Sequence, residues 1–186
     1  MDLVYPVDVA PLLPGSKGGK EMLPIVEASG AVVARTSRAC CHNGSKPLHP
    51  VVHLHIIDRF SRIYLQRRSA RKDLLPLYWD TAVGGHVHYG EYLREALFRE
   101  AAEELRLRDF NPVPLRSYVF ESDTEKELVT VFAAVGAFDI HPDGDEVSEG
   151  RWWEIPELEA AFGKSVLTPN FEQEFPMIKD SLLALL

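Results

Sequence analysis

Apolar residues alternate with polar ones in several short stretches of the chain, a period typical of β-strands, and Gly, Pro, Asn or Asp separate the stretches. The first two stretches predict a hairpin that turns at Ser29-Gly30. Residues 36–50 and the basic segment Arg67–Trp79 are predicted to be loops. The predicted strands are Met22–Glu27, Ala31–Arg35, Val51–Ile57, Ile63–Gln66, Asp80–Val83, Leu115–Glu121, Glu127–Val135 and Gly150–Glu154.

A different period, one apolar residue in every four, predicts a helix over residues 91–105. Pro156 suits the first turn of another helix over Glu157–Phe162. A C-terminal amphipathic helix is predicted from about Asn170, with a local disturbance at Pro176. The apolar stripe of the first helix consists of Leu93, Leu97, Ala101 and Leu105.

Strands interleaved with three helices favour an α/β (α+β) fold, a sandwich with a mixed central sheet, in a single domain over residues 21–186. Residues 1–20 are rich in Pro and Gly and are predicted to be an irregular lead-in. The length of 186 residues, with 46% apolar and 26% charged residues, is that of a soluble globular domain.

Charge and cysteine content narrow the classes of function. A net charge of −8 disfavours binding to a nucleic acid polymer or an anionic membrane, and no apolar run approaches the ~18 residues of a membrane span. Cys40 and Cys41 are neighbours, and adjacent cysteines rarely form a relaxed disulfide, so we expect reduced thiols in a cytoplasmic protein. A homodimer through the N-terminal hairpin is compatible with the sequence.

The helix predicted over residues 91–105 has an unusually acidic polar face. Glu103 and Glu104 lie three and four residues after Glu100, so all three crowd one side of the last turns. Like charges at that spacing destabilise a helix, and they call for a counter-charge. Arg99, four residues before Glu103, is one candidate, and a divalent cation that holds substrate phosphates is the other. A merely solvated face is the alternative.

A strand, a loop and this helix follow one another with fixed gaps between their polar residues. The chain runs from Gly85 over five residues to Glu91, over seven to Arg99-Glu100, and over two to Glu103-Glu104. This spacing resembles the Nudix box, and the resemblance implies a Nudix-type α/β/α sandwich. The position of the glycine that follows the helix in that family is occupied by Arg106 here, so the resemblance does not fix the residue at which the helix ends.

The resemblance also implies a phosphate-cleaving centre that uses Mg²⁺ or Mn²⁺. The cation would polarise a phosphoryl oxygen and lower the pKa of an attacking water. Arg99 would orient the carboxylates, and Glu91 would brace the loop. The ligands implied by the box are Glu100, Glu103, Glu104 and the backbone carbonyl of Gly84.

Residues 40–155 resemble one branch of the superfamily more closely, the type I isopentenyl-diphosphate isomerases, through Pro47-Leu48-His49, Gln66-Arg67-Arg68, Lys72, Trp79 and Gly85-His86. In that branch Arg68 and Lys72 match diphosphate-binding positions, which suits the affinity of cationic side chains for phosphate oxygens. Imidazole ligands favour Mn²⁺ or Zn²⁺ at a second site. His53 and His55 are expected to be bystanders or ordinary hydrogen-bonded residues. The second-site ligands that the resemblance implies are His42, His49, His86, Glu125 and Glu127.

The chain departs from the isomerases where their chemistry needs particular side chains. Their proton-transferring cysteine is Gly84 here, Glu100 and Glu103 replace an arginine and an aromatic residue, and Asn170 and Phe171 stand near their late tryptophan. Without the thiol, the isomerase reaction lacks a side chain that transfers a proton at carbon. The carboxylates implied for a hydrolase, by contrast, are all present. A Nudix hydrolase is therefore the preferred interpretation. An isomerase and a catalytically silent binding module are the alternatives.

Two choices stay open at the level of sequence. Glu127 and Glu149 are equal candidates for the general base, and Glu125 and Glu146 are further candidates. Glu125 and Glu127 can serve as the base if the second metal is absent. The substrate is expected to be a small-molecule diphosphate, either a nucleoside diphosphate derivative or a similar organic diphosphate.

Overall fold

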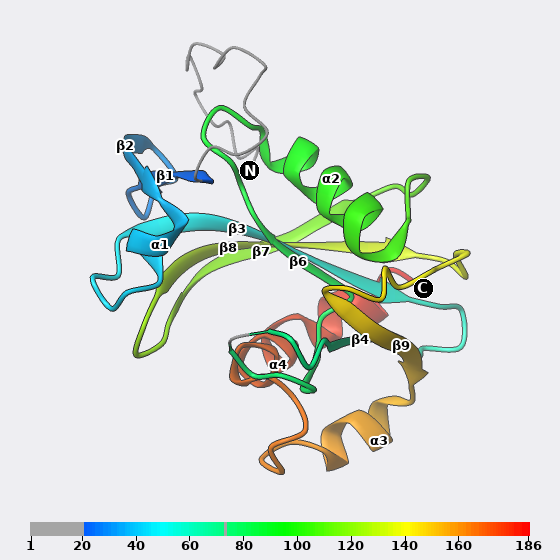
Figure 1. The fold of residues 1–186 in the computed structure, drawn as a ribbon. Coiled ribbons are helices and arrows are strands. Elements are labelled where there is room, and N and C mark those ends of the chain that lie inside the picture. Colours follow the sequence, from blue (N-terminus) through cyan, green and yellow to red (C-terminus); the bar gives the residue numbers. More distant parts are fainter. Residues whose placement is uncertain (1–20, 73) are drawn as a thin grey trace. The chain divides into compact units, whose positions relative to one another are not determined.

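The computed structural model describes residues 21–72 and 74–186 (Figure 1). The predicted lead-in, residues 1–20, lies outside the described residues. The helices are α1 (Arg38–Cys41), α2 (Leu93–Leu105), α3 (Ile155–Ala160) and α4 (Pro169–Leu183). The strands are β1 (Met22–Val26), β2 (Val32–Ser37), β3 (Leu48–Ile57), β4 (Ile63–Arg68), β5 (Trp79–Asp80), β6 (Val83–His86), β7 (Val113–Glu121), β8 (Lys126–Val135) and β9 (Val147–Trp153).

The strands form two hydrogen-bonded sets. β1 and β2 pair antiparallel as the predicted hairpin, which turns with Gly30 at a φ of 86°. The other strands pair in the order β5-β4-β3-β8-β7, with β6 paired to β3 and β9 paired to β4. β4 is antiparallel to β3, β5 and β9. The α+β fold class is as expected.

Three local predictions were wrong. Residues 36–50 are not a loop throughout, because they contain the short helix α1 and the first residues of β3. The predicted strand Asp80–Val83 is two strands, β5 and β6, and β6 continues through Gly84 rather than ending there. β4 extends to Arg68, where its pairing with β9 supplies hydrogen bonds that no local pattern reveals. A four-residue helix is likewise too short to show a periodic pattern.

The chain divides into two compact units. Among the described residues, the first unit contains residues 21–52, 85–96 and 117–130. The second unit contains residues 53–84, 97–116 and 131–186, with residue 73 outside the description. The single-domain organisation remains a prediction. No helix in the described part of the chain is long and apolar enough to cross a membrane.

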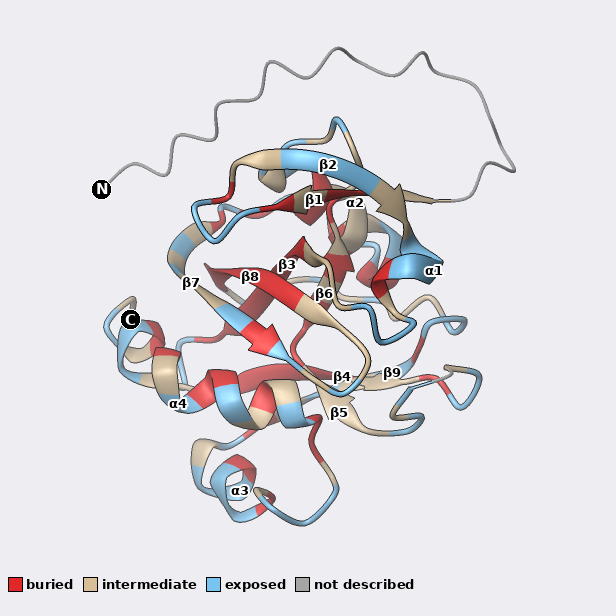
Figure 2. Cartoon of the chain, turned by 90° about the vertical axis from the view of Figure 1, so that its left-hand side faces the viewer, coloured by how far each residue is buried: buried red, intermediate tan, exposed pale blue. Residues whose placement is uncertain are grey.

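Burial differs sharply between strands (Figure 2). β3 and β8 are buried along almost their whole length, whereas β2 is largely exposed. Because both faces of β3 are buried, its polar side chains need hydrogen-bond partners inside the protein. This requirement applies to His49, His53 and His55, which are all buried.

Helix α2 buries most of its predicted apolar stripe. Leu97, Ala101 and Leu105 are wholly buried, and Leu93 is half-buried. Arg106 follows the helix with a φ of 55°, in the left-handed region, and the Leu107 amide donates to the Ala101 carbonyl at 3.0 Å. A residue in the left-handed conformation directly after the last turn is a common way to end a helix, and that position usually employs glycine. The helix therefore ends at Leu105 although no glycine follows it.

Candidate functional site

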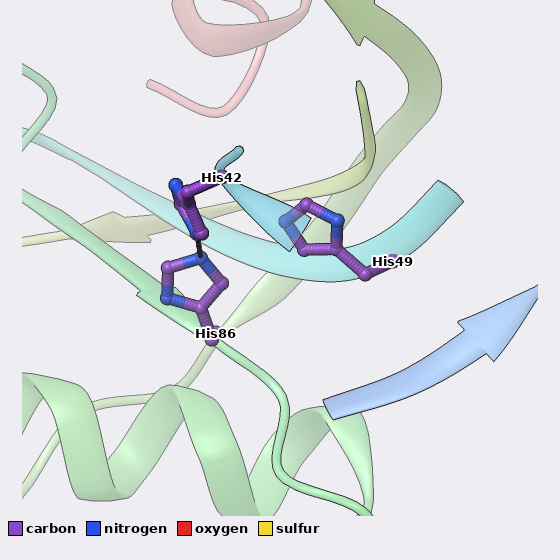
Figure 3. Close-up of side chains that lie close together, drawn as sticks. All are labelled: His42, His49 and His86. Atoms are coloured by element: carbon purple, nitrogen blue, oxygen red, sulfur yellow. Dashed lines mark hydrogen bonds between the residues drawn. The ribbon is translucent and has the colours of Figure 1, made fainter. Parts of the chain in front are cut away.

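Three histidines of the first unit converge (Figure 3). His42 directly follows α1, His49 lies in β3 and His86 ends β6. Each offers one ring nitrogen, and these nitrogens lie within 4.8 Å of one another. Among residues 21–72 and 74–186, they are the one group of three or more His, Cys, Asp or Glu side chains with ligand atoms so close.

The buried ring of His49 has one nitrogen engaged and one without a partner. Its Nδ1 lies 3.0 Å from the Pro47 carbonyl, to which only a protonated Nδ1 can donate. That tautomer leaves a lone pair on Nε2, which is buried and has no hydrogen-bond partner. Metal-binding histidines typically donate the other ring N–H to a backbone carbonyl in this way.

His42 is held from its outer side by a carboxylate. The Oε2 atom of Glu125 lies 2.6 Å from Nδ1 of His42, and Nε2 of His42 lies 3.0 Å from Nε2 of His86. Glu125 is thus placed to orient the ring. It precedes β8 rather than lying in it, whereas Glu127 is buried within β8.

The surroundings of His49 and His86 favour uncharged imidazoles. Burial lowers the pKa of His49, and burial together with the nearby Arg38 guanidinium lowers the pKa of His86 well below its usual range. Neutral imidazole is the form that binds metal ions. The donor set, its burial and the unpartnered Nε2 of His49 fit a Zn²⁺ or Mn²⁺ ion.

The second unit contains a buried carboxylate, that of Glu104. Glu104 on α2 is 5% exposed, and its Oε2 accepts from the Gly84 amide at 3.3 Å and from Nε2 of Gln66 at 3.2 Å. Burial, reinforced by the neighbouring Glu100, raises the pKa of Glu104 well above its ordinary value. Ionising this carboxyl group therefore requires a nearby positive charge.

Arg99 stands between the other two glutamates of the helix. Its Nη1 lies 2.7 Å from Oε1 of Glu100 and 3.3 Å from Oε2 of Glu103. Burial raises the pKa of Glu100, and the Arg99 guanidinium opposes that shift. The side chain of Glu103 is 62% exposed. Arg99 thus forms ion pairs with both carboxylates, and its positive charge offsets part of their repulsion.

Ion pairs hold the basic residues at the end of β4 and in the segment after it. The Lys72 ammonium pairs with Glu146, and Nη1 of Arg67 lies 2.7 Å from Oε1 of Glu149. Arg68 donates through Nη2 and Nε to the Leu74 carbonyl at 3.0 and 3.2 Å, so much of its guanidinium serves the backbone. Lys72 is therefore better placed than Arg68 to exchange its partner for a phosphate.

The loop before α2 is braced as expected. The carboxylate of Glu91 accepts from the His88 amide at 3.0 Å, which closes the loop on itself three residues back. Gly84, at the other end of the predicted box, lies beside the His53 ring, and an added Cβ would be in ordinary van der Waals contact with its Cδ2 at 3.4 Å.

A buried carboxylate that bridges two histidines was not predicted from the sequence. Glu174 on α4 is wholly buried, with Oε2 2.9 Å from Nδ1 of His53 and Oε1 2.5 Å from Nε2 of His55. Burial alone would raise the pKa of Glu174, but the two imidazoles hold it well below its ordinary value. His53 and His55 are hydrogen-bonded residues, as expected. Their partner lies 121 and 119 positions away, beyond any local signal.

Comparison with known proteins places these features in a family. The NUDIX domain model matches residues 47–171. The isopentenyl-diphosphate Delta-isomerase of Mycolicibacterium vanbaalenii is 28% identical over 169 residues, covering 85% of this chain and 91% of the relative. An uncharacterised Nudix hydrolase of Pseudomonas aeruginosa is 33% identical over 130 residues, covering 70% of this chain and 71% of the relative. The crystal structure of DR0079 from Deinococcus radiodurans shares the fold with a TM-score of 0.71 and 24% identity, covering 82% of this chain and 96% of that one. The chain belongs to the NUDIX family.

Proposed function

We propose that the protein is a metal-dependent Nudix hydrolase that cleaves the diphosphate linkage of a nucleoside diphosphate derivative or a similar organic diphosphate. The observation that carries this proposal is Glu104, a carboxylate buried beside the Gly84 amide in a family built around such a helix. Burying an ionised carboxylate is costly unless it is paired or binds a metal. The Lys72 charge favours the ionised form of Glu104, but burial and the neighbouring Glu100 outweigh it and leave the pKa of Glu104 raised.

Glu104, Glu100, Glu103 and the Gly84 carbonyl would hold Mg²⁺ or Mn²⁺, which are hard cations that prefer oxygen ligands. When bound, the cation supplies Lewis-acid polarisation of a phosphoryl oxygen. Arg99 keeps the carboxylates of Glu100 and Glu103 in place.

Side chains around the substrate would bind the phosphates and activate the water. Lys72 and Arg68 would neutralise the diphosphate oxygens. Glu149, or Glu127 if no metal occupies the second site, takes the proton of the attacking water as the water oxygen bonds to phosphorus. The bridging P–O bond breaks, and the second phosphate is released. Glu149 must leave its ion pair with Arg67 to act, whereas Glu127 is buried in β8.

The histidine cluster supports a second candidate function. His42, His49 and His86 match the metal-binding histidines implied by the resemblance to isopentenyl-diphosphate isomerases, and relatives with that name cover most of the chain. Gly84 weighs against this function, since it offers no thiol for proton transfer at carbon. We infer that the cluster holds Zn²⁺ or Mn²⁺ in a protein that hydrolyses rather than rearranges its substrate.

The test is a panel of nucleoside, sugar-nucleotide and prenyl diphosphates incubated with Mg²⁺ or Mn²⁺, with product analysis by mass spectrometry. We expect hydrolysis by the wild type and a loss of about 100-fold or more in kcat for Glu104→Gln. Glu154→Gln, an exposed change outside the site, serves as the matched control and should keep full activity. Allylic rearrangement of isopentenyl diphosphate would favour the isomerase instead. Tight binding without turnover would favour a silent module.

A further inference from the structure

Gln66 stands in the interior of β4 with its side chain 5% exposed. Its backbone is fixed on both sides, by Asp80 of β5 and by Gly150 of β9. The amide Nε2 donates to Oε2 of Glu104 at 3.2 Å. The amide Oε1 is buried and has no hydrogen-bond partner. One side chain thus combines a bond to the buried glutamate with an unpartnered acceptor.

The orientation of this amide follows from its hydrogen bond to Glu104. Because Nε2 donates to that carboxyl group, the NH₂ group of Gln66 faces it. The carbonyl oxygen, on the same carbon, then points away from Glu104. A buried carbonyl oxygen without a donor costs roughly 1–3 kcal/mol, so we expect Oε1 of Gln66 to have a partner in the functional protein. Suitable partners are a metal ion or a water molecule in its hydration shell.

Resting on the proposed function, we infer that Gln66 is a positioning residue of the cation site. Its Nε2 fixes one oxygen of Glu104, and its Oε1 accepts from water that accompanies the cation. The Gly84 amide binds the same Glu104 oxygen at 3.3 Å, so two donors hold that oxygen in place. Side chains that orient a metal ligand in this manner typically change metal affinity by about 10–100-fold when they are replaced.

The decisive experiment measures Mn²⁺ affinity by electron paramagnetic resonance for four proteins, without substrate. Gln66→Met keeps the length of the side chain and removes both polar atoms. Gln173→Met makes the same change at an exposed position of α4 and is the matched control. Glu104→Gln identifies which part of the Mn²⁺ signal belongs to this site. Thermal unfolding in the presence of a chelator reports on the fold alone.

We expect Gln66→Met to bind Mn²⁺ about 10–100-fold more weakly at the Glu104-dependent site. Its melting temperature in chelator should equal that of the wild type or exceed it, because a buried unpartnered oxygen has been removed. An affinity within twofold of the wild type would overturn the inference and leave the proposed function standing, provided that Glu104→Gln still loses the site. If neither the wild type nor Glu104→Gln shows such a site, the inference and the proposed metal chemistry fail together.

Discussion

The Nε2 atoms of His42 and His86 lie 3.0 Å apart, although they come from positions 44 residues apart in the chain. Two imidazole nitrogens at this distance either share one proton or bind the same cation. Zn–N bonds of about 2.0–2.1 Å would place two tetrahedral ligands about 3.3 Å apart, so little movement separates the two arrangements. The separation of these two nitrogens is thus close to that of two ligands of one Zn²⁺ ion.

Replacing His49 tests this cluster. His49→Ala removes the buried Nε2 that has no partner and should weaken Zn²⁺ or Mn²⁺ binding by tenfold or more, because a three-ligand site becomes a two-ligand site. Metal content by mass spectrometry and competition with a chromogenic chelator measure the loss. His141→Ala, at an exposed position, is the control and should bind metal as the wild type does. Equal metal content in both variants would argue against the cluster as a metal site.

The buried Glu174 predicts a pH-dependent stability. Its pKa is lowered in the folded protein, so its contribution is complete above the ordinary value of 4.5 and is lost as the pH falls towards the folded value. Glu174→Gln should reduce the free energy of unfolding at pH 7 by about 3–5 kcal/mol, since it leaves two buried imidazoles without their carboxylate. Urea denaturation between pH 7 and pH 3 should show the difference shrinking below pH 4.5.

Asp180→Asn is the control for this variant, because it changes an exposed carboxylate on the same helix. Its effect should stay within about 0.5 kcal/mol. A difference between wild type and Glu174→Gln that stays constant over the whole pH range would show that the ionised carboxylate is not the source of the stability.

Arg106 adopts a left-handed backbone conformation that costs a non-glycine residue roughly 1–2 kcal/mol. Arg106→Gly should therefore raise the free energy of unfolding, by about 0.5–1 kcal/mol once the greater freedom of glycine in the unfolded chain is subtracted. Arg108→Gly, nearby and exposed but outside the left-handed region, should lower it instead. Chemical denaturation of both variants separates backbone strain from loss of an arginine.

Lys72 is expected to contact the substrate. Lys72→Met should raise KM for a diphosphate substrate about tenfold while kcat changes less. The reason is that the ammonium group of Lys72 stabilises the bound substrate and the transition state equally. Initial rates over a range of substrate concentrations give both constants. The exposed Lys164→Met controls for the loss of one positive charge from the protein. A change confined to kcat would assign Lys72 a role in the chemical step instead.

Periodic and spaced features could be predicted from the sequence, since they depend on residues close along the chain. The hairpin at Ser29-Gly30, the helix α2 and the spacing of its glutamates are of this kind. Features made by distant residues could not. The short helix α1 has no period to detect, and Gln66 meets Glu104 only because β4 and α2 fold together across 38 positions. Gln66 stands in β4 between three largely apolar residues and two arginines, so no local pattern distinguishes it from an ordinary polar residue of a strand.

The shared guanidinium of Arg99 has a consequence for the charge balance of helix α2. Because it lies between Glu100 and Glu103, one positive charge offsets part of the repulsion between the two carboxylates. The helix can therefore bring these two acidic side chains together during folding by using a charge from its own sequence.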